Sequence, residues 1–234
     1  MDEDFSECHD LAEKHPEKLR GLVEQWWADA GAFDVLPLDD RDYERVAADI
    51  AARRRTTYVY YPGMARIDRL SAPDIADRSY SIAAEVEVPS TGAEGVLLAS
   101  GTRFAGYVLY VKDRRLVYEY VYSENTRYTI RCEVPVPTGR SVLRYEFAKT
   151  GPRRGRGTLS IDGRPVGSAE IPKTWPVYAV SGGILCGRDG GSPVSDAYGC
   201  PFAFTGTIHR VVVELGADGK IDARGEHRAA LAEE

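Results

Sequence analysis

The first 55 residues carry an apolar pattern with the period of an α-helix. Five large apolar side chains recur at i, i+3, i+4 and i+7 spacings, so they share one helix face. These residues are Leu19, Leu22, Val23, Trp26 and Trp27. Pro16 suits the first helical turn and Gly31 a C-terminal cap, and a second, shorter helix is predicted over residues 40–53. Because two adjacent tryptophans broaden the apolar face, we expect it to pack against another surface.

Beyond this helical segment the period changes to two, which is typical of β-strands. Ile82, Ala84 and Val86 alternate with polar or small residues, which predicts a strand with one buried face. Residues 106–122 are predicted to form a hairpin whose turn lies at residues 113–114. Further strands are predicted over residues 128–134, 141–147, 158–161, 165–171, 183–186 and 207–215.

This succession of short strands defines the predicted fold class. About ten strands at close spacing, separated by turns that carry Gly and Pro, predict a mainly β chain folded as an antiparallel β-sandwich or jelly roll. The chain then divides into a helical lead-in over residues 1–55, a β-sandwich over residues 56–218 and a tail over residues 219–234, which we expect to be frayed.

Composition and charge exclude some classes of partner. With 43% hydrophobic and 28% charged residues, a chain of 234 residues can bury one sizeable core. The net charge of −6 argues against a nucleic-acid partner. The absence of an 18-residue apolar run argues against a membrane span. The start Met1-Asp2-Glu3-Asp4 is acidic where a signal peptide is basic, so a cytoplasmic product is expected if Met1 is the natural start.

Several segments resemble the C-terminal region of bacterial arylsulfatases. The run Asp10-Leu11-Ala12-Glu13-Lys14-His15-Pro16-Glu17-Lys18-Leu19 resembles the end of a sulfatase catalytic domain, and Asp34-Val35-Leu36-Pro37-Leu38-Asp39-Asp40-Arg41 resembles the sequence that follows it. Further matches are residues 60–63, 78–80, 92–97, 107–113 and 187–194. The resemblance covers nearly the whole chain. It implies a concanavalin-like sandwich without the catalytic domain.

The sulfatase nucleophile is missing from this sequence. In the family, the first residue of a Cys-or-Ser-x-Pro-x-Arg motif is oxidised to formylglycine beside a calcium ion. The residues that follow Cys8, Cys132, Cys186 and Cys200 do not fit this motif. We therefore expect no catalytic residue, metal or cofactor in this chain. Calcium, formylglycine and sulfuric ester hydrolase activity are expected only in a full-length relative.

Tyrosines supply the candidate ligand-binding residues. Tyr118, Tyr120 and Tyr122 share one face of the predicted hairpin, where aromatic rings can stack on a sugar. Such rings also fill sandwich cores, and the pattern favours a core or an interdomain interface over an exposed platform. A lone histidine, His209, is expected to be packed on the apolar face of its strand.

Two groups of acidic residues are candidates for a catalytic or metal-binding role. Glu85 and Glu87 lie about 7 Å apart on one strand face, a spacing that glycoside hydrolases use. Their usual motif needs an acid at Ser90, so a solvated strand face is favoured. The loop 189–196 has oxygen donors that calcium prefers. A structural turn, in which Asp189 or Ser192 bonds local backbone amides, is favoured there.

Two functions remain open. The first is a non-catalytic accessory module of an arylsulfatase-like protein that packs on, or shapes, the substrate cleft. Its partner would be a sulfatase catalytic domain, in cis or in trans, reached through the tryptophan-bearing helix face, which could otherwise self-associate. The second is a free-standing lectin-like sandwich that binds a carbohydrate or a sulfate ester. An enzyme in its own right is the least favoured.

Overall fold

A computed structural model describes residues 8–38, 55–176 and 181–218. They belong to two compact units, Met1–Ala52 and Arg53–Glu234. The predicted second helix at 40–53 and the predicted tail at 219–234 lie outside the described residues.

The described part of the first unit is built on one helix, α1 (Pro16–Ala32). Proline occupies its first turn, as predicted, because the missing N–H has no partner to lose there. The helix ends at Ala32 and its C-cap residue is Phe33 rather than Gly31; the Phe33 N–H donates to the carbonyl of Asp29. No helix in the described part of the chain is both long and apolar enough to cross a membrane.

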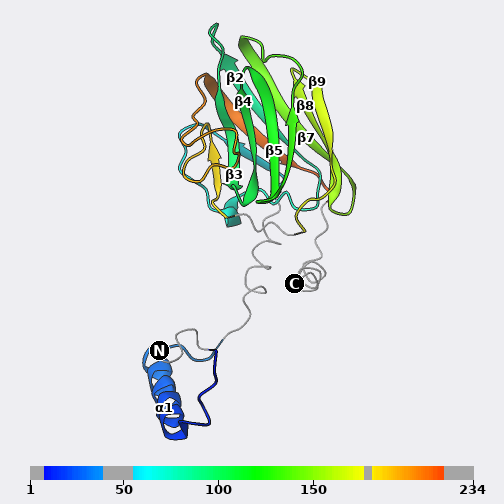
Figure 1. Cartoon of the computed structure of the whole chain (residues 1–234). Helices are drawn as coiled ribbons and strands as arrows, with labels where there is room; N and C mark the ends of the chain where they lie inside the picture. Colours follow the sequence, from blue (N-terminus) through cyan, green and yellow to red (C-terminus); the bar gives the residue numbers. More distant parts are fainter. Residues whose placement is uncertain (1–7, 39–54, 177–180, 219–234) are drawn as a thin grey trace. The chain divides into compact units, whose positions relative to one another are not determined.

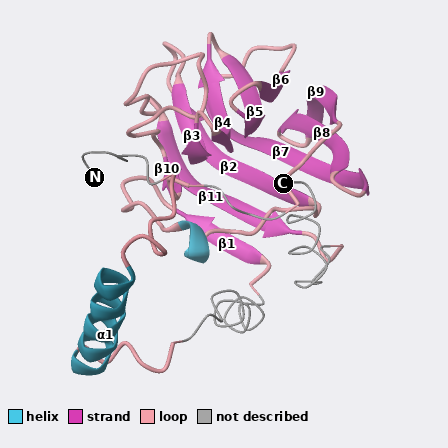
Figure 2. Cartoon of the chain, turned by 60° about the horizontal axis from the view of Figure 1, so that its bottom comes forward, coloured by secondary structure: helices cyan, strands magenta, loops and turns pink. Residues whose placement is uncertain are grey.

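The second unit is a two-sheet antiparallel sandwich (Figure 1). Its described elements are β1 (Thr57–Tyr60), η1 (Arg69–Ser71), β2 (Tyr80–Val88), β3 (Gly95–Thr102), β4 (Ala105–Lys112), β5 (Arg115–Ser123), β6 (Thr126–Arg131), β7 (Gly139–Gly151), β8 (Arg154–Ile161), β9 (Arg164–Ile171), β10 (Ile184–Cys186) and β11 (Thr207–Leu215). One sheet has the order β1-β11-β2-β7-β8-β9 and the other β10-β3-β4-β5-β6. In Figure 2, β1, β11, β2 and β7 lie side by side. The predicted mainly β fold, an antiparallel β-sandwich, is confirmed.

The core lies between the sheets and follows the period-two pattern. Ile82, Ala84 and Val86 of β2 are fully buried, as their alternation predicts. The facing sheet contributes Leu109 and Tyr118, among others. The sandwich is thus stabilised mainly by apolar area removed from water.

The predicted hairpin turn at residues 113–114 forms, and the Asp-Gly pair at residues 162–163 makes a second one. Asp113 and Arg114 join β4 to β5 with φ of 50° and 59°, and Asp162 and Gly163 join β8 to β9 with φ of 50° and 78°. Two consecutive positive φ values are the geometry that matches the twist of paired strands. The period-two pattern of the sequence does not predict strands β1 and β3.

The expectation for His209 is wrong. The pairing of β11 with β2 shifts register between Ile208 and Arg210, so a bulge turns His209 outward while Val211 returns to the core. The imidazole Nε2 lies 3.6 Å from a Glu87 carboxylate oxygen on the solvated face.

Candidate functional site

The three candidate tyrosines do not form an exposed platform. Tyr118 and Tyr120 are 0% and 2% exposed and lie between the sheets. The Tyr118 ring stacks on Tyr145 with centroids 3.4 Å apart. Burial raises the pKa of the Tyr118 hydroxyl well above its usual value. Tyr122 is half-buried, with the Lys173 ammonium 4.6 Å from its ring centre. An exposed platform is therefore excluded for Tyr118 and Tyr120, which are core residues.

The residues predicted to form an interdomain interface are all exposed on α1. Their exposed fractions lie between 44% and 56% for Leu19, Leu22, Val23, Trp26 and Trp27. The two indoles contact each other edge to face, with centroids 4.8 Å apart.

The outer face of the five-stranded sheet is covered by the loop that follows β10. Val194 and Tyr198 of this loop pack on Val108, Tyr110 and Val117. Because the core covers the inner face and the loop covers the outer one, β4 and β5 are buried at almost every position. Their near-continuous apolar sequence reflects these two buried faces.

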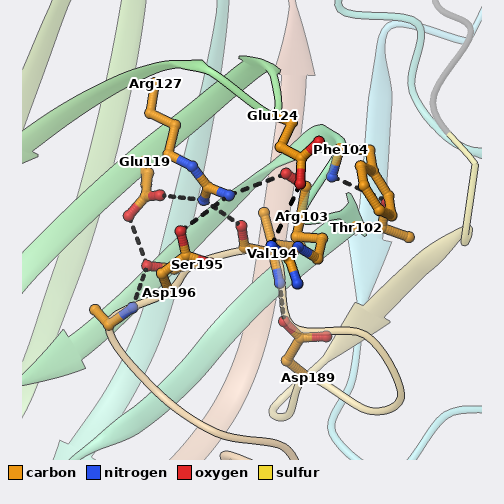
Figure 3. A network of polar contacts seen from close by, with 11 residues as sticks. Thr102, Arg103, Phe104, Glu119, Glu124, Arg127, Asp189, Val194, Ser195 and Asp196 are labelled. Atoms are coloured by element: carbon orange, nitrogen blue, oxygen red, sulfur yellow. Dashed lines mark hydrogen bonds and ion pairs between the residues drawn. The ribbon is translucent and has the colours of Figure 1, made fainter.

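A buried ion pair anchors this loop to the sheet (Figure 3). Glu119 of β5 accepts a hydrogen bond from Arg127 Nη1 of β6 at 3.0 Å and another from Ser195 Oγ at 2.6 Å. Arg127 also donates to the carbonyl of Val194 at 3.0 Å and lies 3.2 Å from an Asp196 carboxylate oxygen. The side chains of Glu119 and Arg127 are only 7% and 18% exposed. The network fixes residues 194–196 against β5 and β6.

Asp189 stabilises the same loop from within. One carboxylate oxygen accepts the Val194 N–H at 2.9 Å and the Tyr198 hydroxyl at 2.8 Å. Burial and the nearby Asp189 charge raise the pKa of Tyr198, so this hydroxyl remains a donor. The interpretation of Asp189 as a turn residue is confirmed. Across residues 8–38, 55–176 and 181–218, no cluster of three or more His, Cys, Asp or Glu side chains is arranged to hold a metal.

A pocket of about 380 Å³ lies beside this network. Its volume is within the range of about 300–1,000 Å³ that is common for small-molecule sites. The lining consists of Tyr110, Lys112, Asp113, Val117, Glu119, Arg127, Thr129, Arg131, Ser195, Asp196 and Ala197. The pocket is thus formed by strands β4, β5 and β6 together with the anchored loop.

The charges of this pocket balance. Its cationic side chains are Lys112, Arg127 and Arg131, and its carboxylates are Asp113, Glu119 and Asp196. Arg131 donates to Asp113 at 3.0 Å, and both side chains are more than half exposed. Lys112 donates to the carbonyl of Ala197. The pocket therefore presents many hydrogen-bonding groups and no net formal charge.

The sequence does not predict this pocket, although the predicted turn at residues 113–114 and the loop 189–196 contain three of its lining residues, Asp113, Ser195 and Asp196. One signal was present: Glu119 is a carboxylate inside the apolar run Val117-Tyr118-Glu119-Tyr120-Val121. A charge in a buried strand needs a partner. The partner, Arg127, lies on the neighbouring strand, and Ser195 lies far along the chain.

Comparisons with solved structures find several similar chains, all at low sequence identity. The CBM40 of Ruminococcus gnavus IT-sialidase, bound to alpha2,3 sialyllactose, has 18% identity and a TM-score of 0.44, covering 61% of this chain and 80% of that one. Mouse laminin alpha1 domains LG4-5 have 11% identity and a TM-score of 0.41, covering 72% and 42%. The botulinum neurotoxin serotype G binding domain has 11% identity and a TM-score of 0.38, covering 76% and 42%. These values transfer no site residue to this chain.

No protein-family model matches the sequence, and no curated protein matches it either. The resemblance to arylsulfatases therefore receives no support from these comparisons. The class that the two sheets define is an antiparallel β-sandwich.

Proposed function

We propose that the sandwich is a carbohydrate-binding module that holds its ligand in the pocket over β4, β5 and β6. The single observation that carries this proposal is the pocket beside the Glu119–Arg127 ion pair, which is lined by charged and hydroxyl-bearing side chains together with apolar ones. A saccharide is recognised through many directed hydrogen bonds, and this lining supplies both donors and acceptors.

The Glu119–Arg127 ion pair carries a desolvation cost, so a gain in stability alone does not explain why it is buried. Removing a carboxylate and a guanidinium from water is expensive, and replacing a buried ion pair by apolar residues is often neutral or stabilising. Here the pair holds Ser195 and Asp196 at the edge of the pocket. Preorganised polar groups of this kind raise affinity because fewer side chains must be ordered on binding.

The balance of charge favours a ligand rich in hydroxyl groups. An anionic ligand would be attracted by Arg131 and Lys112 but would also meet Asp113 and Asp196, which line the same pocket. A neutral saccharide can accept from the cationic groups and donate to the carboxylates without this penalty. We therefore expect hydrogen bonding, rather than net charge, to dominate the affinity.

The proposal predicts binding that depends on Arg131. The full chain is screened on an array of neutral, sialylated and sulfated oligosaccharides, and the best binder is titrated by calorimetry. Arg131→Ala should weaken that binding at least tenfold, because a charged hydrogen bond to the ligand is worth about 1.5–3 kcal/mol. The melting temperature should change little, since the Arg131–Asp113 pair is exposed.

A matched control is Arg140→Ala, which removes a 73% exposed arginine from the other sheet. It should leave the affinity unchanged. If no oligosaccharide binds, or if the two variants behave alike, the pocket is not a carbohydrate site. An affinity that is confined to sulfated or sialylated ligands and falls steeply with salt would contradict the neutral-ligand part of the proposal.

One observation favours a second function, the accessory module of an arylsulfatase-like protein. The apolar side chains of α1 are exposed, which suits a helix that packs on another domain. This reading predicts that an arylsulfatase catalytic domain supplied in trans binds the chain, and that replacing Trp26 and Trp27 with Gln abolishes the complex. Failure to form a complex in size-exclusion chromatography would count against it.

A further inference from the structure

Helix α1 leaves most of its apolar face exposed between Leu19 and Trp27. Residues 16–29 are all exposed, and Ala30 is the buried residue of the helix. The exposed apolar side chains fall within a single face because they are spaced by three or four positions. Among residues 8–38, Phe33 extends this face at the end of the helix, where it is 77% exposed.

The exposed area is sufficient for a small interface. Two half-exposed indoles together with Leu19, Leu22 and Val23 present about 500 Å² of mostly apolar surface. If two copies buried these faces against each other, the total would be about 1,000 Å², which is roughly the minimum for a biological interface and suits a weak, reversible dimer. Phe33 would add to that area.

The charges at the edges of the face are arranged for antiparallel pairing with a second copy. Lys18 and Asp29 lie along one edge, and Arg20 and Glu24 lie along the other. On both edges the basic residue is nearer the N-terminus. In an antiparallel pair, the same edge of each copy meets its counterpart, and the two edges run in opposite directions. Each basic residue therefore faces an acidic residue of the other copy. In a parallel pair opposite edges meet, so Lys18 would face Arg20 of the second copy.

Among residues 8–38, the contacts of these edge groups are weak. Within α1, Arg20 donates to Glu17 at 3.2 Å, but the two side chains are 64% and 83% exposed. An exposed pair of this kind is weak and can exchange partners. The exposed apolar area and the charge pattern are independent observations, and both favour pairing of α1 with a second copy.

We infer that α1 is a self-association helix that pairs antiparallel with α1 of a second copy of this chain. The association does not depend on the proposed carbohydrate site. If that site is also real, the dimer carries two of them, and binding to a surface that displays many glycans gains avidity of about 10²–10⁴-fold.

Sedimentation equilibrium of the full chain tests this inference. The unaltered chain should be a reversible dimer, and Trp26→Gln with Trp27→Gln should raise the dissociation constant about hundredfold, since large aromatics dominate interface affinity. The melting temperature of the sandwich should stay the same. A chain that is monomeric at all concentrations would overturn the inference, whether the face is covered by the sandwich or by another protein.

A charge exchange tests the antiparallel direction. Lys18→Asp should weaken the dimer about tenfold, because two attractive contacts become repulsive. Adding Asp29→Lys should restore the affinity to within about threefold, since the exchanged charges again face each other. Lys14→Asp makes the same change of charge outside the helix and should have little effect. If the exchange does not restore affinity while circular dichroism shows an intact helix, the antiparallel assignment is wrong.

Discussion

Replacing Arg127 with alanine should lower the free energy of unfolding by about 3–5 kcal/mol, because Glu119 is left buried with an uncompensated charge. For a domain of this size that corresponds to a fall of about 6–20 °C in melting temperature. The change also removes the hydrogen bond that holds the Val194 carbonyl. The loop should then loosen, and the pocket should lose its shape. Calorimetry of the purified variant measures the loss directly.

Two variants make this prediction specific. Glu119→Gln combined with Arg127→Gln removes both charges and should recover a large part of the lost stability. Arg156→Ala, which breaks an exposed pair with Glu170, should cost less than about 1 kcal/mol. If Arg127→Ala unfolds no more easily than Arg156→Ala, the ion pair does not anchor the loop.

Tyr118→Ala should be similarly costly, lowering the free energy of unfolding by about 3–5 kcal/mol, because it empties a fully buried aromatic position. The ring loses its stack on Tyr145, and the Tyr80 hydroxyl loses a partner at 2.6 Å. Tyr118→Phe should cost about 1 kcal/mol, since only the hydrogen bond is removed. Denaturant unfolding separates the two variants.

The control for Tyr118 is Tyr61→Ala, at a side chain that is 58% exposed. It should change stability by no more than about 0.5 kcal/mol. If Tyr118→Ala were equally mild but abolished oligosaccharide binding, Tyr118 would be a ligand platform after all, and its placement in the core would be wrong.

The sequence was most informative where one side of a strand meets water. The alternation at Ile82, Ala84 and Val86 predicts β2 because its outer face is solvated. Turn chemistry likewise predicts the hairpin at residues 113–114, since Asp113 tolerates a positive φ. Both features depend on local physics, so a single sequence reveals them.

The sequence was least informative where both faces of a strand are buried. In β5 the odd positions pack under the loop and the even positions pack in the core, so period two no longer identifies the inner face. The sequence alone therefore left open whether Tyr118, Tyr120 and Tyr122 lie in the core or form an exposed platform. The anchored loop was equally inaccessible, because Ser195 reaches Glu119 across 76 positions of the chain.

The register shift before Arg210 shows a third limit. A single extra residue in β11 turns His209 to the outer face of the sheet. The apolar pattern that follows it in the sequence gives no sign of this change. Bulges depend on how two strands pair. One strand considered alone does not contain that information.

The most direct test of the carbohydrate proposal is a titration of the isotope-labelled full chain with the best oligosaccharide from the array, followed by NMR. The account predicts that amide shifts concentrate at Thr129, Arg131 and residues 195–197, which line the pocket. Shifts centred on the outer face of the six-stranded sheet around Arg140 and Arg210, or on α1, would contradict it, as would a spectrum that no oligosaccharide changes.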